Sequence, residues 1–148
     1  MNIQDINIKL LNEKAIMPTY GSTYSAGADL YACIDNEIEI KPGDTEFIGT
    51  GISLEIPIGF VGLVYARSSL GCKKGLAPAN KVGVIDSDYR GELIIALHNH
   101  SKEKQIIKPN DRIAQIVFTP YLKANFKELN DLSDTERGSG GFGSTDKK

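Results

Sequence analysis

Short hydrophobic runs separated by turn residues restrict the fold of this chain more than any other sequence feature. Lys41-Pro42-Gly43-Asp44 and Ile56-Pro57-Ile58-Gly59 are typical of tight turns, because proline fixes φ and glycine tolerates positive φ. The runs between such turns predict strands at Ile6–Leu11, Asp29–Cys33, Glu37–Ile40, Thr45–Ile48, Ile52–Ile56, Phe60–Ala66, Val82–Ile85, Glu92–His98, Gln105–Ile107 and Arg112–Thr119. Many short strands at close spacing predict an all-β fold, a sandwich or a jelly-roll-like distorted barrel.

The character of the sequence changes after Leu122. A chain of 148 residues suits one folded domain, which we assign to residues 1–122. Within it only Ser68–Lys74 has a helical pattern, with Ser68 as its N-cap and Gly75 as its stop. Residues 123–148 are polar and then glycine-rich, which gives too little apolar surface to offset the entropy lost on ordering. We therefore expect a mobile C-terminal arm.

Charge and composition exclude several classes of protein. The formal net charge of −2 and the mixed placement of charges give no basic face, so we expect no binding of long nucleic acid. No hydrophobic run approaches the ~20 residues that span a bilayer, and the N-terminus has no signal-peptide pattern. Cys33 and Cys72 are too few for a disulfide framework and have no evident histidine base. These features predict a cytoplasmic protein without a membrane anchor.

The segment Gly83–Gly91 concentrates polar side chains between two hydrophobic runs. The runs are expected to hold it as a rigid turn that contains Asp86, Asp88, Tyr89 and Arg90. A carboxylate fixed at the end of a strand can orient and deprotonate a water molecule as a general base. Aspartate and serine also build turns by bonding to their own backbone. These residues alone therefore leave a catalytic role and a structural role for Asp86 open.

Two other segments carry residues suited to an anion. Arg67-Ser68-Ser69 lies where a strand gives way to a helical turn, so a guanidinium and backbone N–H groups come together. The alternative is a helix cap and a surface ion pair. Gly138–Gly143 matches G-x-G-x-x-G but lacks the strand and helix of a dinucleotide site. With Arg137, Ser144 and Thr145 it can still contact phosphate, or it is a disordered tail.

Four further residues are candidates for metal or polar contacts. Asp29 begins a strand and can face either a turn or a hydrated Mg²⁺ carried by a polyphosphate. Gln115 alternates with hydrophobic neighbours, and its alternative is a solvated strand residue. His98 and His100 lie on one face of a strand, but no third ligand stands at a supporting spacing.

Taken together, five segments resemble the five motifs of the trimeric dUTP diphosphatase (dUTPase) family, in the family's order. Each segment is weak evidence alone, whereas five ordered matches over nearly the whole chain are highly specific. The segments are Ala26-Gly27-Ala28-Asp29-Leu30-Tyr31, Ala66-Arg67-Ser68-Ser69-Leu70-Gly71, Gly83-Val84-Ile85-Asp86-Ser87-Asp88-Tyr89-Arg90-Gly91, Arg112-Ile113-Ala114-Gln115 and Arg137-Gly138-Ser139-Gly140-Gly141-Phe142-Gly143-Ser144.

The resemblance implies a β jelly-roll homotrimer in which residues of all three subunits form each active site. It also implies Mg²⁺-dependent hydrolysis of dUTP to dUMP and pyrophosphate by attack of water on the α-phosphorus. Such a reaction keeps uracil out of DNA and supplies dUMP for thymidylate synthesis. In this family the C-terminal arm reaches across the trimer and its glycine-rich end closes over the nucleotide.

Roles for individual residues follow from the motif match. Asp86 is expected to be the base, Tyr89 to exclude a 2′-hydroxyl at the deoxyribose, and Asp29 to contact Mg²⁺ through water. The hairpin that reads uracil is expected to comprise Asn80, Gly83, Val84 and Ile85. The phosphate contacts are expected from Arg67, Ser68, Ser69 and Gln115. The lid is expected to comprise Arg137, Phe142, Gly143, Ser144 and Thr145, with Phe142 stacked on uracil.

The sequence departs from the family pattern at three positions. Ala66 replaces a frequent proline, Ser69 a common glycine, and Asn110 the glycine that often precedes the fourth motif. None of these changes removes a functional side chain. Asn110 is acceptable there because asparagine visits positive φ more readily than most residues, whereas Ser69 adds bulk beside the expected phosphate.

Two alternative functions compete with this assignment. The related dCTP deaminases share the Arg-Ser-Ser-Leu and Ile-Asp segments but use a catalytic glutamate where this chain has Ala96. Without that carboxylate, deamination has no proton carrier. The other alternative is a jelly roll that senses dUTP or binds a protein partner without catalysis. Asp86, Tyr89 and a complete tail argue against it.

Overall fold

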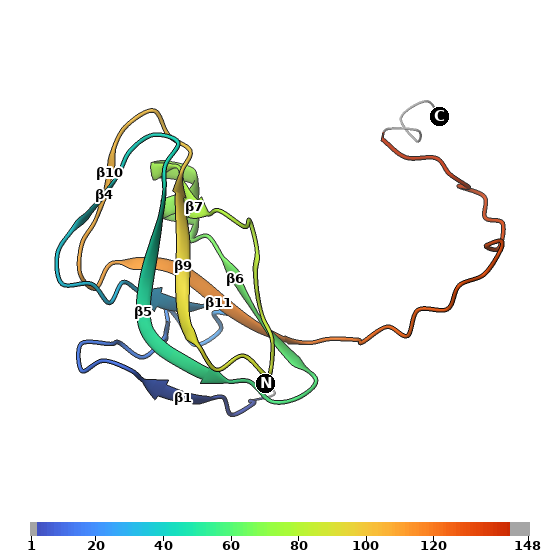
Figure 1. Cartoon of the computed structure of the whole chain (residues 1–148), viewed down its shortest axis with the longest axis horizontal. Coiled ribbons are helices and arrows are strands. Elements are labelled where there is room, and N and C mark those ends of the chain that lie inside the picture. The colour runs from blue at the N-terminus through green and yellow to red at the C-terminus, as the bar shows by residue number, and fades with distance from the viewer. Residues whose placement is uncertain (1–2, 143–148) are drawn as a thin grey trace.

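The structure is a computed structural model that describes residues 3–142, and it is built from antiparallel β-sheets (Figure 1). One sheet has the strand order β1-β5-β9-β7, a second has the order β2-β3-β11-β6-β8, and β10 pairs with β4. The strands are β1 (Asn7–Leu10), β2 (Thr19–Tyr20), β3 (Ala28–Tyr31), β4 (Ile38–Ile40), β5 (Thr45–Glu55), β6 (Phe60–Tyr65), β7 (Leu76–Pro78), β8 (Gly83–Ile85), β9 (Glu92–Asn99), β10 (Gln105–Ile107) and β11 (Arg112–Pro120). The prediction of an all-β fold is confirmed.

Strand β5 is continuous, whereas the sequence predicted two strands there. Its pairing with β9 shifts register between Gly49 and Ser53, and Gly51 has a φ of 67°. The backbone N–H of Gly51, at this irregularity, donates to the Glu92 carboxylate at 2.8 Å. The predicted break at residues 49–51 is therefore a bulge, in which three residues of β5 stand against one residue of β9 and the strand continues. The short strands β2 and β7 were not predicted.

The one helical segment among residues 3–142 is the π-helix η1 (Ser69–Lys74). Ser68 stands at the N-cap position, as predicted, but its side chain makes no capping hydrogen bond. Its backbone is already helical (φ −54°, ψ −41°), and an N-cap needs an extended backbone to direct its oxygen at the helix. Gly75 ends the helix as predicted, in the left-handed conformation with φ 67°.

The core lies between the sheets and is almost entirely aliphatic. Along β9 the alternation is regular: Leu93, Ile95 and Leu97 are buried, whereas Ile94 is 53% exposed. The largest fully buried hydrophobic side chains are Leu30, Ile40, Ile48, Ile52, Leu76, Leu93, Leu97, Ile107, Ile113 and Ile116. This packing fixes the strands whose ends carry the polar residues discussed below.

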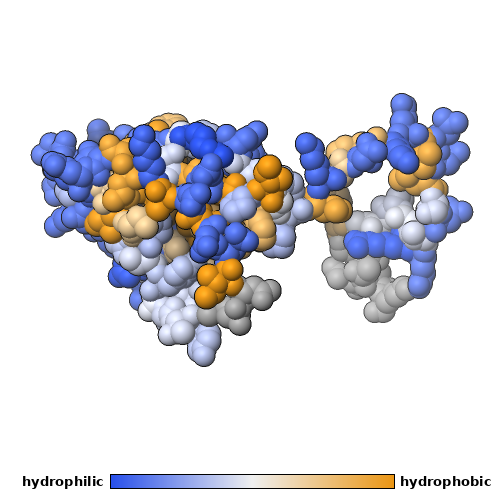
Figure 2. Space-filling model, turned by 90° about the horizontal axis from the view of Figure 1, so that it is seen from below, coloured by the Kyte–Doolittle hydropathy of each residue, from blue (hydrophilic) through white to orange (hydrophobic). Residues whose placement is uncertain are grey.

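The chain leaves the barrel after β11. Residues 121–142 contain no helix or strand and are almost all exposed, and they extend away from the sheets (Figure 1). This polar segment also contains exposed hydrophobic residues, among them Phe126 and Leu132. Figure 2 shows the segment apart from the barrel. Among the residues the structure describes, no helix is long and apolar enough to cross a membrane.

Asn99 is a fully buried polar residue that joins the end of β4 to the loop after β9. Its Nδ2 donates to the carbonyl oxygens of Ile40 (2.9 Å) and Glu103 (2.8 Å), and its Oδ1 accepts from the Ser101 N–H at 2.9 Å. Asn99→Ala should therefore lower the free energy of unfolding by roughly 1–3 kcal/mol for each buried group left unpaired.

Urea denaturation followed by circular dichroism, at matched protein concentration, measures this loss. Asn36→Ala is the control, because Asn36 is exposed and a surface substitution changes stability by about 0.5 kcal/mol or less. Equal midpoints for the two variants would contradict the structural role of Asn99.

Candidate functional site

Three neighbouring strands bring polar residues of separate sequence segments to one place. Strand β11 lies between β3 and β6, and Gln115 on β11 stands opposite both Asp29 on β3 and Tyr65 on β6. Residues directly opposite each other in antiparallel strands project from the same face. Arg67 follows two residues after β6 ends, so it reaches the same face as Asp29.

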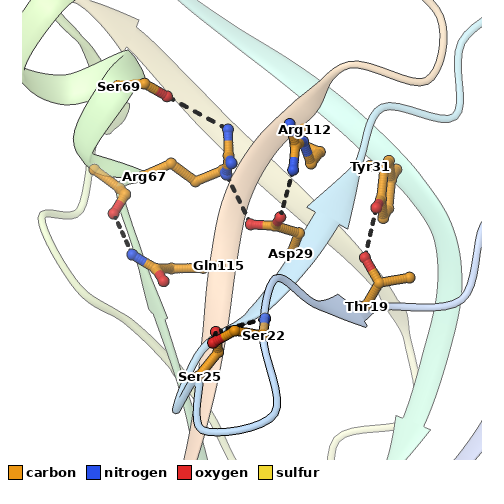
Figure 3. A network of polar contacts seen from close by, with 10 residues as sticks. Thr19, Ser22, Ser25, Asp29, Tyr31, Arg67, Ser69, Arg112 and Gln115 are labelled. Carbon is orange, nitrogen blue, oxygen red and sulfur yellow. Dashed lines mark hydrogen bonds and ion pairs between the residues drawn. The ribbon is translucent and has the colours of Figure 1, made fainter.

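The Asp29 carboxylate is held between two guanidinium groups (Figure 3). Arg67 Nε donates to Asp29 Oδ1 at 2.7 Å, and Arg112 Nη1 donates to Oδ2 at 3.3 Å. Asp29 is only 8% exposed, and a buried carboxylate needs such partners to offset its lost hydration. The cluster carries two positive charges and one negative charge, so it is suited to an anion.

Further contacts fix the orientation of Arg67 and Gln115. Arg67 Nη1 lies 3.4 Å from Ser69 Oγ, and Gln115 Nε2 donates to the Ala66 carbonyl at 2.9 Å (Figure 3). A Cβ at Gly27 would meet the amide end of Gln115, so a larger residue there would displace the Gln115 side chain. The cleft beside these residues has a volume of about 440 Å³ and is lined by Gly21, Ser25, Ala26, Gly27, Asp29, Tyr65, Arg67, Ser68, Arg112, Gln115 and Val117.

The turn after β8 forms a second polar region. Asp86 is exposed, and its carbonyl accepts the N–H of Tyr89 at 3.2 Å, which closes the turn. The Tyr89 hydroxyl donates to the Glu92 carbonyl at 3.0 Å, and its ring occupies the space that a side chain at Gly91 would need. Asp86 and Tyr89 line a cavity of about 180 Å³.

A neighbouring cavity of about 220 Å³ lies against the same hairpin. Its lining includes Asn80 and Gly83, and it shares Ile85, Leu93 and Ile94 with the cavity beside Asp86. A Cβ at Gly83 would lie 3.2 Å from the Val64 Cβ and 3.3 Å from the Asn80 amide nitrogen. The structure thus groups the residues predicted to read a base with the predicted catalytic aspartate.

The predicted site is divided within one chain. The cleft beside Asp29 and the two hairpin cavities share no lining residue. Arg137 and Phe142 lie on the segment that leaves the barrel, where Arg137 Nε donates to the Gly140 carbonyl at 2.9 Å and Phe142 is exposed. The predicted lid residues Gly143, Ser144 and Thr145 lie outside the described residues.

Arg112 was not predicted as a site residue, although the structure places it in the cleft. Arg112 pairs with Tyr31 across β11 and β3, two residues along β3 from Asp29. The fourth motif begins with this arginine, but only the pairing register directs its guanidinium to Asp29. The sequence does not give this pairing register, so the contact between Arg112 and Asp29 could not be predicted from it.

The histidine pair is not part of a metal site in the described region. No group of three or more His, Cys, Asp or Glu residues that could hold a metal occurs among residues 3–142. The rings of His98 and His100 lie 4.3 Å apart, and Lys81 Nζ lies 3.3 Å from His100 Nε2. Desolvation, then the positive charge of Lys81, then His98 lower the pKa of His100.

The chain is similar over nearly its whole length to proteins of one family. The family model described as dUTPase matches residues 13–146. The deoxyuridine 5′-triphosphate nucleotidohydrolase of Syntrophotalea carbinolica is 46% identical over 140 residues, covering 95% of each chain. That of Nautilia profundicola is 47% identical over 142 residues, covering 96% of this chain and 99% of the relative. The solved structure of the Staphylococcus bacteriophage 80alpha dUTPase with dUPNHPP has a TM-score of 0.83 at 28% identity and covers 96% of this chain and 98% of that one.

Proposed function

This chain belongs to the dUTPase family, and from that premise we propose that it hydrolyses dUTP to dUMP and pyrophosphate with Asp86 as the general base. The observation that carries the activity is the full-length similarity to deoxyuridine 5′-triphosphate nucleotidohydrolases. The structure adds a cleft suited to an anion and a hairpin that presents a carboxylate beside an aromatic ring.

The cleft beside Asp29 is the proposed binding site for the triphosphate. Arg67 offers guanidinium N–H groups, Ser68 and Ser69 offer hydroxyl and backbone donors, and Gln115 offers its amide. Arg112 joins this set on the strength of its position in the cleft. Charge stabilisation and positioning supply most of the catalysis in phosphoryl transfer, so a donor-rich, preorganised cleft is the appropriate machinery.

The hairpin is the proposed binding site for deoxyuridine. Asn80 and the backbone of Gly83, Val84 and Ile85 read the uracil, because fixed donors and acceptors reject cytosine by leaving polar groups unpaired. Tyr89 packs against the deoxyribose and leaves no room for a 2′-hydroxyl.

Asp86 performs the proton transfer. Its carboxylate takes a proton from a water molecule while the water oxygen bonds to the α-phosphorus. The bond from the α-phosphorus to the bridging oxygen of the β-phosphate breaks, and pyrophosphate leaves with that oxygen. A carboxylate held at the end of a strand, beside the sugar, is suitably placed for this role.

The family's enzymes use Mg²⁺, and the cleft suits an ion that arrives with the substrate. Mg²⁺ keeps several waters and is commonly held by one or two carboxylates together with substrate phosphates, rather than by an all-protein cage. The lack of a three-ligand cluster among residues 3–142 fits that mode. Asp29 is the proposed partner of the hydrated ion, through water. When bound, Mg²⁺ neutralises charge on the phosphate oxygens.

A homotrimer with shared active sites is proposed because one chain does not complete the site. The separation between the Asp29 cleft and the hairpin cavities supports an arrangement in which one subunit supplies the phosphate contacts and another supplies Asp86. The arm, residues 123–148, would then bring Arg137, Phe142, Gly143, Ser144 and Thr145 over a site on the assembly. Its extension away from the barrel supports this role (Figure 1).

Release of pyrophosphate from dUTP, dCTP, dTTP and UTP, each with Mg²⁺, tests the proposed function. Release from dUTP alone is expected. Asp86→Asn should keep affinity for a non-hydrolysable dUTP analogue and lose at least about 100-fold in kcat, the usual contribution of a general base. Deaminated product from dCTP, or unchanged turnover by Asp86→Asn, would overturn the assignment.

Mixing inactive variants tests whether the sites are shared. Arg67→Ala and Asp86→Asn subunits, denatured together and refolded, should form hybrid trimers in which some sites have both intact residues, so part of the activity returns. Asp86→Asn mixed with Tyr89→Ala is the matched control, because both residues line one cavity of one chain. Recovery in neither mixture, despite confirmed hybrid trimers, would exclude sharing between subunits.

Truncation before Arg137 tests the lid. The shortened protein should keep its oligomeric state and its unfolding midpoint, because the hydrogen bonds of Arg137, Gly138 and Gly140 join residues within the arm. Its kcat should fall steeply, by about 100-fold or more, since closure positions the phosphates and excludes water. A normal rate measured by pyrophosphate release would show that the lid is dispensable.

A further inference from the structure

The side chain of Arg90 is hydrogen-bonded to the turn that carries Asp86. Its Nη1 donates to the carbonyl oxygens of Ser87 at 2.7 Å and Tyr89 at 3.0 Å. One guanidinium thus joins two backbone groups of the same turn, one residue and three residues before its own position. Hydrogen bonds from a charged donor are stronger than those between neutral groups.

Arg90 also fastens this turn to the neighbouring sheet. Its backbone carbonyl accepts the hydroxyl of Ser53 at 2.6 Å, and Ser53, on β5, is only 7% exposed. Its Nη2 lies 3.5 Å from Glu55 Oε1, and the other oxygen of Glu55 accepts from Asn7 Nδ2 at 2.7 Å. The turn is therefore linked through one residue to β5, and through Glu55 to β1.

The Asp86 carboxylate depends on the backbone of the turn for its position. Among the residues the structure describes, no side chain donates a hydrogen bond to it, and Asp86 is exposed. Tyr89 is held by its own bond to the Glu92 carbonyl and by its packing over Gly91. The bonds from Arg90 to Ser87 and Tyr89 are the side-chain contacts that fix the turn between these two functional residues.

The side-chain contacts of Arg90 fix the conformation of the turn more than they stabilise the fold. Its ion pair with Glu55 spans 3.5 Å between side chains that are 51% and 56% exposed, and such surface pairs contribute little to stability. A catalytic group, by contrast, must be held within about 0.5 Å of its productive position.

We propose that Arg90 is a positioning residue, which holds the turn so that Asp86 faces the attacking water and Tyr89 faces the sugar. The inference rests on the proposed function. It predicts two linked defects when the guanidinium is lost: slower chemistry, through Asp86, and weaker rejection of ribonucleotides, through Tyr89. A residue that only stabilised the fold would produce neither defect in the protein that remains folded.

Arg90→Ala should lower kcat for dUTP by about 10- to 100-fold, since small misplacements of a reacting group have effects of that size. The ratio of kcat/KM for UTP to that for dUTP should rise, and the unfolding midpoint should change little.

Added guanidinium chloride at millimolar concentration should restore part of the rate of Arg90→Ala. Arg90→Lys should be intermediate, because a single ammonium nitrogen can donate to the two carbonyls, as Nη1 does, but has no second nitrogen for Glu55. Lys9→Ala is the control, since Lys9 lines the groove beside Arg90 without touching the turn.

Hydrogen exchange at the Tyr89 amide separates this inference from the proposed function. That N–H bonds to the Asp86 carbonyl, so exchange should be faster in Arg90→Ala than in the wild type and in Lys9→Ala. Absence of dUTP hydrolysis by the wild type would overturn the proposed function, and the exchange rates would still decide whether Arg90 anchors the turn. Unchanged exchange, or an unchanged kcat in a wild type that is active, would overturn the inference.

Discussion

The pairing of Asp29 with both Arg67 and Arg112 is the interaction on which the proposed phosphate cleft depends. Two guanidinium groups repel each other and would turn toward solvent if nothing lay between them. The buried carboxylate holds both at 2.7 and 3.3 Å, so their remaining N–H groups stay directed at the cleft. Because the cluster keeps a net positive charge, the carboxylate organises an anion site without neutralising it.

The β-sheets supply the rigidity that this arrangement requires. Strand β11 is paired on both sides, and the register that sets Gln115 opposite Asp29 also sets it opposite Tyr65. A slip of one residue would turn every side chain of β11 to the other face. The hairpin with Asp86 belongs to the edge of the same sheet, through β8. Ile85, just before Asp86, pairs with Gly62 near the start of β6, whereas Arg67 follows the other end of β6, so the turn and the cleft lie toward opposite ends of that strand.

Local chemistry made several features predictable. Asn110 has a φ of 67°, as expected for an asparagine where the family often has glycine, and Gly75 ends the helix in the same region of φ. The prediction failed where neighbouring strands decide the outcome. Separate strands were predicted at Thr45–Ile48 and Ile52–Ile56, yet pairing with β9 carries β5 through a bulge between them. Ser68 indicated a cap, but its backbone is drawn into the helix.

The sequence by itself determined the class of fold, the family and the residue types of the site, because alternation, turn residues and five ordered motifs are local properties of the chain. The tertiary structure decided which of those residues meet. It placed Arg112 on Asp29, bonded Arg90 to the turn of Asp86, and kept that turn apart from the cleft. Such contacts depend on strand register and on long-range packing, which no local pattern specifies.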